Sequence, residues 1–330
     1  MHVLNFLEAP IRVHGVPFFY ETGRLERLPE ELRIKYPHFS KLGRRCAGAR
    51  LRFMTNTEKL YIKVLLEENG ADYGIPLWGS AGINVYADES YVQCAYPKDH
   101  NTNVIEGEFS LDGMYHDITV FLPRNEVILD ISIGIDDGAD IREASPYTYN
   151  VPVLYYGSSI TEGGCATKPG NAYNAFISRW LDVDYYNMGF SGAARGELDV
   201  CDYLNTIEKS VFVMDYDHNS PNVYHLESTH EAFFKRIREH DPFLPVVFIS
   251  RPNTDIDPLD AGMRFEVIKK TYQNAVNAGD RNVYLIDGST LFGTDDREAC
   301  TADTCHPNDL GMYRMAKVIA PVIKEILDKE

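Results

Sequence analysis

The spacing of apolar residues predicts strands along the first part of the chain. In EVILDISIGI (126–135) apolar side chains stand at every second position, at Val127, Leu129, Ile131, Ile133 and Ile135. This alternation is typical of a strand with one buried face. The segments at 50–53, 59–66 and 116–122 predict further strands, and no long helical pattern interrupts them. Short strands separated by turns predict a β-sandwich over residues 1–145.

From residue 151 the pattern changes to short apolar runs that alternate with amphipathic stretches. The apolar runs are VPVLYYG (151–157), VDYYNMGF (183–190), SVFVMDYD (210–217), LPVVFIS (244–250) and NVYLIDG (282–288). Helix-like stretches lie near 172–181, 197–209, 225–240 and 262–278, and a last helix has Met312, Met315, Ala316, Ile319, Ile323 and Ile326 spaced along one face. Strands that alternate with helices predict a parallel sheet covered on both sides over residues 146–330, with 136–150 as the join.

Polar residues with complementary chemistry follow the strands of this predicted sheet. In such sheets, ligands bind beyond the carboxyl ends of the strands. The strand tips and the approach to the last helix carry Ser159, Gly192, Asn219, Asp303 and His306. We expect these residues to supply a nucleophile, a base, an acid that orients the base, and two oxyanion donors.

Each of these residue types has a chemical reason to be there. A serine hydroxyl is a poor nucleophile until a neighbouring imidazole takes its proton. Asp303 lies three residues before His306, so a single turn can bring its carboxylate behind the ring to accept the Nδ1 hydrogen. Backbone N–H groups and an asparagine amide suit the negative oxygen of a tetrahedral intermediate. The pattern therefore predicts acyl transfer through a serine.

Four short blocks resemble those of the SGNH (GDSL-type) hydrolases. They are GSSIT (157–161), which resembles GDSxT, NMGFSG (187–192), which resembles the second block, DHNS (217–220), which resembles GxND, and DTCHPNDLGM (303–312), which resembles the DxxHP block. The resemblance implies an α/β hydrolase domain with three α/β/α layers and a flavodoxin-like sheet. It implies Ser159 as the nucleophile, Asp303 and His306 as the rest of the triad, and the Ser159 and Gly192 N–H groups and the Asn219 amide as the oxyanion hole.

A further resemblance extends the match over nearly the whole chain. GINVY (82–86) is similar to the GxDLY signature of a β-rich module that precedes some SGNH domains. Three positions depart from the blocks: Ser158 replaces the Asp of GDSxT, Asp217 the Gly of GxND, and Asn84 the Asp of GxDLY. Ser158 lies outside the triad, and Asp217 is expected to reshape its loop.

Two other functions stay open at this point. A metal-dependent hydrolase could use a mixed set of ligands: Asp217, His218, Asp303, Cys305 and His306. Neither HExxH nor a comparable metal-binding spacing supports this set. A metal site would also leave Ser159 and Asn219 without a role. The other alternative is a glycan-binding protein with an inactive hydrolase domain, against which the intact set of site residues argues.

Two more residues are candidates for substrate contact. Arg251 follows the fourth predicted strand of the sheet and could bind an anionic or polar substrate group, although a surface ion pair explains it equally well. Trp78 could offer a sugar ring an aromatic surface, and packing between domains is the simpler explanation. We expect residues 74–86 to wall the cleft and to leave a small acyl pocket.

Composition and charge narrow the range of partners. The 330 residues are 44% hydrophobic, 25% charged and 12% aromatic, with a net charge of −17. So acidic a chain argues against an extended nucleic-acid surface. No stretch has the pattern of a secretory signal or approaches the ~20 apolar residues of a membrane span. The six scattered cysteines include no CxxC pair, which favours a reduced, cytoplasmic protein.

The patterns together predict a two-domain serine esterase. We expect its substrate to be a short-chain ester, above all an acetyl ester of a carbohydrate or another small metabolite. Neither a cofactor nor a metal is expected, and neither is a nucleic-acid or membrane partner. Self-association into a homo-oligomer stays open.

Overall fold

The computed structural model describes residues 1–70 and 74–329, and two antiparallel sheets make up its first part. One sheet has the order β1 (His2–Asn5), β9 (Ile128–Ile135), β4 (Lys59–Leu66) and β7 (Val104–Ser110). The other has the order β10 (Ile141–Arg142), β3 (Arg50–Thr55), β8 (His116–Phe121), β5 (Ile83–Ala87) and β6 (Ser90–Ala95), with β2 (Arg12–His14) beside β3. One apolar core contains inward residues of both sheets, such as Ile62, Ile133 and Val120. The predicted all-β first part is thus confirmed.

Strand β9 departs from the simple alternation that its sequence predicts. Leu129 was expected on the buried face, but its side chain is 53% exposed. Opposite it on β4, Leu65 pairs with Asp130 and Leu66 with Ile128, so Leu129 is the extra residue of a β-bulge. The alternation of apolar residues holds only from Ile131 onward, where Ile133 and Ile135 are also buried.

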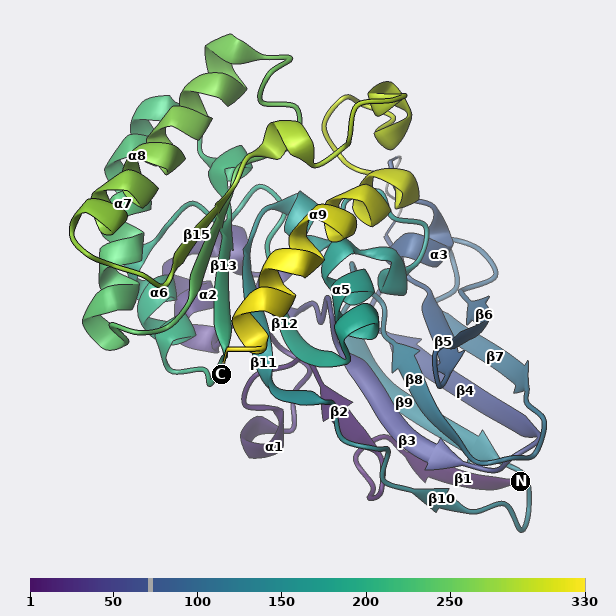
Figure 1. Ribbon diagram of the computed structural model, residues 1–330. Coiled ribbons are helices and arrows are strands. Elements are labelled where there is room, and N and C mark those ends of the chain that lie inside the picture. Colours follow the sequence, from purple (N-terminus) through teal and green to yellow (C-terminus); the bar gives the residue numbers. More distant parts are fainter. Residues whose placement is uncertain (71–73, 330) are drawn as a thin grey trace.

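A parallel five-stranded sheet forms the second part. Its order is β12 (Val183–Gly189), β11 (Tyr149–Gly157), β13 (Val211–Asp215), β14 (Val246–Ile249) and β15 (Val283–Ile286). Helices α5 (Tyr173–Leu181) and α9 (Asp309–Leu327) pack together on one face, and α6 (Leu198–Asn205), α7 (Val223–His240) and α8 (Met263–Asn277) cover the other, as Figure 1 shows. This 2-1-3-4-5 order is the flavodoxin-like arrangement, so the predicted three-layer fold is confirmed.

The two parts share their cores. Short helix α2 (Glu30–Lys35) and the segment around it bring Leu28, Leu32 and Phe39 into the core beneath α6 and α7. On the other face, Tyr86 of β5 and Phe121 of β8 join the core beneath α5 and α9. The hydrophobic interior of the parallel sheet therefore includes residues from the first 145.

Strand β3 shows how the antiparallel part meets the parallel sheet. In an alternating strand its arginines would lie on the face opposite the core residues Leu51 and Phe53, yet Arg50 is fully buried and Arg52 is 7% exposed. Arg50 forms an ion pair with Asp184 of β12, and the Arg52 guanidinium lies 4.0 Å from the ring centre of Tyr147. The segment expected as the join, 136–150, contributes β10, whose Ile141 still pairs with Thr55 of β3.

The remaining helices are short. They are α1 (Phe19–Thr22), α3 (Leu77–Ser80) and α4 (Ser159–Glu162), together with single-turn segments such as Asp217–Asn219. Within the described ranges, no helix has the length and apolar character that crossing a membrane requires. None of the six cysteines, all of which the structure describes, forms a disulfide.

The shared cores predict that residues 146–330 do not fold well alone. Removing residues 1–145 takes away Leu28, Leu32, Phe39, Tyr86 and Phe121, and so exposes apolar surface on both faces of the parallel sheet. We expect the 146–330 fragment to aggregate or to unfold without cooperativity, measured by size-exclusion chromatography and urea denaturation. A monomeric fragment with a sharp unfolding transition would contradict this expectation.

Candidate active site

Ser159 lies at the turn between the central strand β11 and the short helix α4. Gly157 ends the strand, and a Cβ at this glycine would collide with the Asp215 carbonyl of the neighbouring strand. Ser158 caps α4, since its Oγ accepts a hydrogen bond of 3.1 Å from the Ile160 N–H. The departure from the GDSxT block at Ser158 therefore places a good N-cap residue before the helix. The Ser159 N–H stands in the first turn, where helix N–H groups have no intrahelical acceptor.

A chain of hydrogen bonds joins Ser159, His306 and Asp303. Ser159 Oγ lies 2.8 Å from His306 Nε2, and His306 Nδ1 lies 2.6 Å from Asp303 Oδ2. The second Asp303 oxygen accepts from the backbone N–H groups of His306 and Cys305, at 2.7 and 3.0 Å. The carboxylate is thus fixed by its own turn, and it holds the ring with Nε2 directed at the serine.

The electrostatics of this turn favour a charged carboxylate and a basic imidazole. Partial burial raises the pKa of Asp303, but hydrogen bonds from the His306 ring and backbone and from the Cys305 N–H outweigh it and bring the pKa to about 2. The Cys305 side chain and the Asp303 carboxylate raise the pKa of His306 to about 9, against the opposing effect of partial burial. The ring therefore binds a proton more tightly than an ordinary histidine does.

The two other predicted donors lie beside this chain and bond to each other. Gly192 has a φ of +67°, a conformation that favours glycine, and its N–H donates to Asn219 Oδ1 at 3.1 Å. Asn219 Nδ2 in turn donates to the Phe190 carbonyl at 2.9 Å. The structure thus brings all five predicted site residues to the carboxyl ends of β11, β12 and β13, as the strand-end argument requires.

Glu162 is a structural part of the site that the sequence did not identify. It is 2% exposed, and its Oε1 accepts from Arg27 Nη2 at 2.9 Å. Its Oε2 accepts from the Ser191 N–H at 3.1 Å and from the Ser191 hydroxyl. One carboxylate therefore ties α4 to the loop that carries Gly192. A charged residue one helical turn after Ser159, in an otherwise uncharged segment, is the signal that could have pointed to it.

These residues line a cleft of about 610 Å³. Its lining includes Ser159, Gly192, Asn219, Asp303 and His306, together with Arg45, Arg124, Arg195, Gly74 and Ile75. The expected wall from residues 74–86 thus reaches the cleft through Gly74 and Ile75. Ile75 is the one large aliphatic side chain among the described residues that line the cleft.

Trp78 and Arg251, the two candidates for substrate contact, lie outside this lining. The Trp78 side chain is 41% exposed and packs edge-on against Tyr96, with ring centres 5.4 Å apart. Arg251 forms ion pairs with Asp257 and Asp260, at 3.1 and 3.2 Å. Its ion pairs account for Arg251, and neither residue is among those that line the cleft around Ser159.

Part of the alternative metal set also comes together. Ligand atoms of Asp303, Cys305 and His306 lie within 4.8 Å of one another, and Cys305 Sγ lies 2.9 Å from His218 Nε2. Burial, with Arg251 as a smaller influence, lowers the pKa of His218 to about 4, so its ring is neutral and able to bind a cation. Asp217 stands apart, because its Oδ2 accepts from the Arg251 N–H. The hydrogen bonds within the Ser159–His306–Asp303 chain already use the nitrogens of His306.

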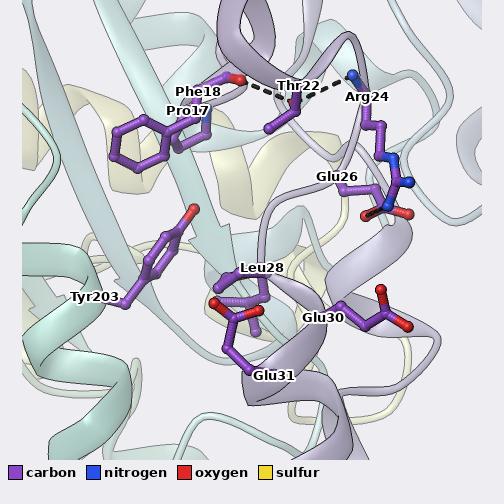
Figure 2. Close-up of a pocket in the computed structure, with 10 residues that line it drawn as sticks. Pro17, Phe18, Thr22, Arg24, Glu26, Leu28, Glu30, Glu31 and Tyr203 are labelled. Carbon is purple, nitrogen blue, oxygen red and sulfur yellow. Dashed lines mark hydrogen bonds and ion pairs between the residues drawn. The ribbon is translucent and has the colours of Figure 1, made fainter.

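A second cavity, near α1 and α2, is lined by none of the residues predicted as nucleophile, base or oxyanion donor. It is lined by Phe18, Leu28 and Tyr203 together with acidic residues, among them Glu30 and Glu31, as Figure 2 shows. The Thr22 hydroxyl there donates to the Phe18 carbonyl and accepts from the Arg24 N–H, so it serves the local turn. None of the predicted site residues lines this cavity.

Comparison with known families accounts for most of the chain. Residues 150–324 match the model of the GDSL-like lipase/acylhydrolase family, and residues 1–141 match that of the N-terminus of Esterase_SGNH_hydro-type proteins. The resemblance expected from the sequence blocks and from GINVY is therefore confirmed. No curated protein sequence matches the chain.

Several solved structures share the whole architecture. A protein from Bacteroides ovatus ATCC 8483, described as a GDSL-like lipase, is 24% identical, with a TM-score of 0.86 over 99% of this chain and 98% of that one. The salicylyl-acyltransferase SsfX3 from a tetracycline biosynthetic pathway is 17% identical, with a TM-score of 0.78 over 98% and 97%. A family two carbohydrate esterase from Clostridium thermocellum, in complex with cellohexaose, is 14% identical, with a TM-score of 0.63 over 99% of both chains. Identities this low show a common fold.

Removing the charge of Glu162 should destabilise the protein strongly. Glu162→Gln leaves the guanidinium of fully buried Arg27 without a counter-charge, and breaking a buried pair in this way typically costs about 3–5 kcal/mol. We expect the free energy of unfolding, measured by urea denaturation, to fall by that order. The matched control is Glu227→Gln, which removes an exposed partner of Lys270 and should change stability little. Equal effects of the two substitutions would rule out the structural role of Glu162.

Proposed function

The chain belongs to the GDSL-like lipase/acylhydrolase family, and from this premise we propose that it is a serine esterase acting on short-chain, above all acetyl, esters of a carbohydrate or a similar small molecule. The observation that carries the proposal is the hydrogen-bonded chain from Ser159 Oγ through His306 to Asp303, with steps of 2.8 and 2.6 Å. This geometry lets one imidazole accept the serine proton while a carboxylate fixes its tautomer.

The reaction follows from these contacts. Ser159 Oγ attacks the ester carbonyl carbon as its proton passes to His306 Nε2, and the carbonyl oxygen becomes an oxyanion. The imidazolium, stabilised by Asp303, then gives the proton to the departing alcohol, which leaves an acyl group on the serine. A water molecule, deprotonated by His306, attacks the acyl carbon and releases the carboxylic acid. The imidazolium formed in this second step gives its proton to Ser159 Oγ as the acyl–serine bond breaks, so a proton from water replaces the serine proton that left with the alcohol.

The oxyanion would be held by donors from three loops. The Ser159 N–H points from the first turn of α4, and the Gly192 N–H and Asn219 amide stand on the neighbouring strand ends. Because Gly192 donates to Asn219 Oδ1 at 3.1 Å, oxyanion binding would redirect that N–H from Asn219 to the substrate. Such preorganised donors commonly supply the largest part of the rate enhancement in acyl transfer.

The residues that line the cleft favour a substrate in which a small acyl group is esterified to a polar alcohol. Only Ile75 offers a large aliphatic surface among the described lining residues, so a fatty chain would find little to cover it. Polar and charged side chains make up most of the rest, which suits a hydroxyl-rich acceptor. The similarity of fold to a family two carbohydrate esterase and to an acetyl xylan esterase agrees with this choice.

Replacing the nucleophile tests the mechanism directly. Ser159→Ala should abolish hydrolysis of p-nitrophenyl acetate and leave the thermal unfolding curve close to that of the wild type, because the change is small. A phosphonate should label the wild-type protein at Ser159, as read by mass spectrometry. Treatment with EDTA should leave the activity unchanged. Turnover by the alanine variant, or loss of activity with EDTA, would support the metal-dependent alternative instead.

The pH dependence should reflect the raised pKa of His306. Only the neutral imidazole accepts the serine proton, so kcat/KM should rise with pH and level off above about 9. Asp303 stays ionised throughout, because its pKa is about 2. Cys305→Ser should move the midpoint to lower pH, since Cys305 contributes most to raising the pKa of His306. A wild-type midpoint near 6.5 would contradict the raised pKa.

The acyl preference should fall with chain length. Methylene groups beyond the small pocket gain no binding energy and would clash with its wall, so kcat/KM should decline steadily along the series of p-nitrophenyl esters from acetate to octanoate. Ile75→Ala should flatten the series if this side chain closes the acyl pocket. Equal activity on octanoate and acetate in the wild-type protein would mean that the proposed small pocket does not exist.

A further inference from the structure

The cleft beside Ser159 carries the opposite sign of charge from the molecule as a whole. The chain has a net charge of −17, yet three arginines, Arg45, Arg124 and Arg195, line this cleft. Both carboxylates in the described lining already have partners, because Glu162 binds Arg27 and Asp303 binds His306. Arg45 and Arg195 therefore add positive charge at the place where a substrate would bind.

Arg195 lies on the loop that also carries Gly192. Its Nε and Nη2 donate to the Gly192 carbonyl, at 3.2 and 2.9 Å. Within the described ranges, no carboxylate lies within 4.0 Å of its guanidinium. The nearby carboxylate of Glu197 accepts from the Arg195 backbone N–H instead. The guanidinium is thus positioned by a neutral carbonyl and keeps its charge available to a ligand.

Arg45 approaches the cleft from the first part of the chain. Its carbonyl accepts from Arg27 Nε at 2.7 Å, which fixes its backbone, while its own Nε is buried without an acceptor. Glu68 and Glu126 lie close enough to interact with its charge, but Glu68 pairs with Lys41, and Glu126 accepts from the Gly70 N–H. Within residues 1–70 and 74–329 the Arg45 guanidinium forms no ion pair, so its charge stays available to an anion in the cleft.

The proposed reaction gives these two arginines no task. The oxyanion has its donors in the loops of Ser159, Gly192 and Asn219, and the proton moves through His306. Planar guanidinium groups match carboxylate, sulfate and phosphate groups with paired hydrogen bonds. We propose that the alcohol part of the ester carries such an anionic group, bound by Arg45 and Arg195. This inference rests on the esterase function proposed for the same cleft.

A matched pair of substrates tests the inference. The free carboxylate of an O-acetylated methyl glucuronoside is compared with its neutral carboxamide, and acetate release gives kcat/KM for each. We expect the carboxylate to be preferred about 10- to 100-fold, the usual range for a charged hydrogen-bonded contact. Raising the ionic strength should reduce the preference. Sulfated and phosphorylated methyl glycoside acetates, run alongside, identify which anion fits best.

Variants assign the preference to particular residues. Arg45→Gln and Arg195→Gln should each lower the carboxylate-to-carboxamide ratio toward one, whatever happens to the absolute rates, because Arg195 also holds the Gly192 carbonyl. The matched control is Arg236→Gln, which removes an exposed arginine of α7 that pairs with Asp202 and Glu239, and should keep the wild-type ratio. If Arg195→Gln slowed both substrates equally, the arginine would act on the reaction itself, and the inference would be wrong for that residue.

Binding separates this inference from the esterase proposal. The Ser159→Ala variant, titrated calorimetrically with both compounds, should bind the carboxylate more tightly by the same factor, whether or not the wild type turns them over. Hydrolysis of both compounds at equal rates with equal binding would overturn the anion site alone. Preferential binding without any hydrolysis would overturn the esterase proposal alone.

Discussion

The buried ion pair between Arg27 and Glu162 is the contact on which the rest of the site depends. Arg27 is fully buried, and its five N–H groups meet five acceptors. These are the carbonyls of Leu42, Arg45, Asn187 and Gly189 and the Glu162 carboxylate. Such complete pairing is what makes a buried charge tolerable. The arginine therefore cannot move without breaking contacts to the first part of the chain, to β12 and to α4 at once.

This arrangement explains why the β-rich part and the hydrolase part share an interior. Arg27 crosses between them, and three more arginines do the same at other points along the contact. Arg50 meets Asp184, Arg124 donates to the Gly163 carbonyl at 2.5 Å, and the Arg179 guanidinium lies 4.6 Å from the ring centre of Tyr86. Apolar burial holds the two parts together, while these directional contacts fix their position. The strand ends that carry Ser159 and Gly192 are thus braced from outside the parallel sheet.

Sequence patterns predicted the fold class. They also predicted that the site residues gather at the carboxyl edge of the parallel sheet, because both features follow from short-range rules. Apolar periodicity depends on which face of an element is buried, and parallel strands align their carboxyl ends. The bulge at Leu129 escaped prediction, since a single extra residue leaves no signal in an otherwise regular alternation. The burial of Arg50 and Arg52 escaped it too, because their partners, Asp184 and Tyr147, lie far along the chain. Long-range pairing of charges has no local pattern.

The bond between Gly192 and Asn219 bears on how the proposed oxyanion hole would discriminate. At rest the Gly192 N–H is satisfied by a neutral amide oxygen at 3.1 Å. A ground-state ester carbonyl would offer another neutral acceptor, so exchanging one bond for the other would gain little. An oxyanion would form a charge-assisted bond, which is roughly twice as strong. The gain would therefore appear mainly as the tetrahedral intermediate forms, and stabilisation confined to that stage raises turnover more than it tightens substrate binding.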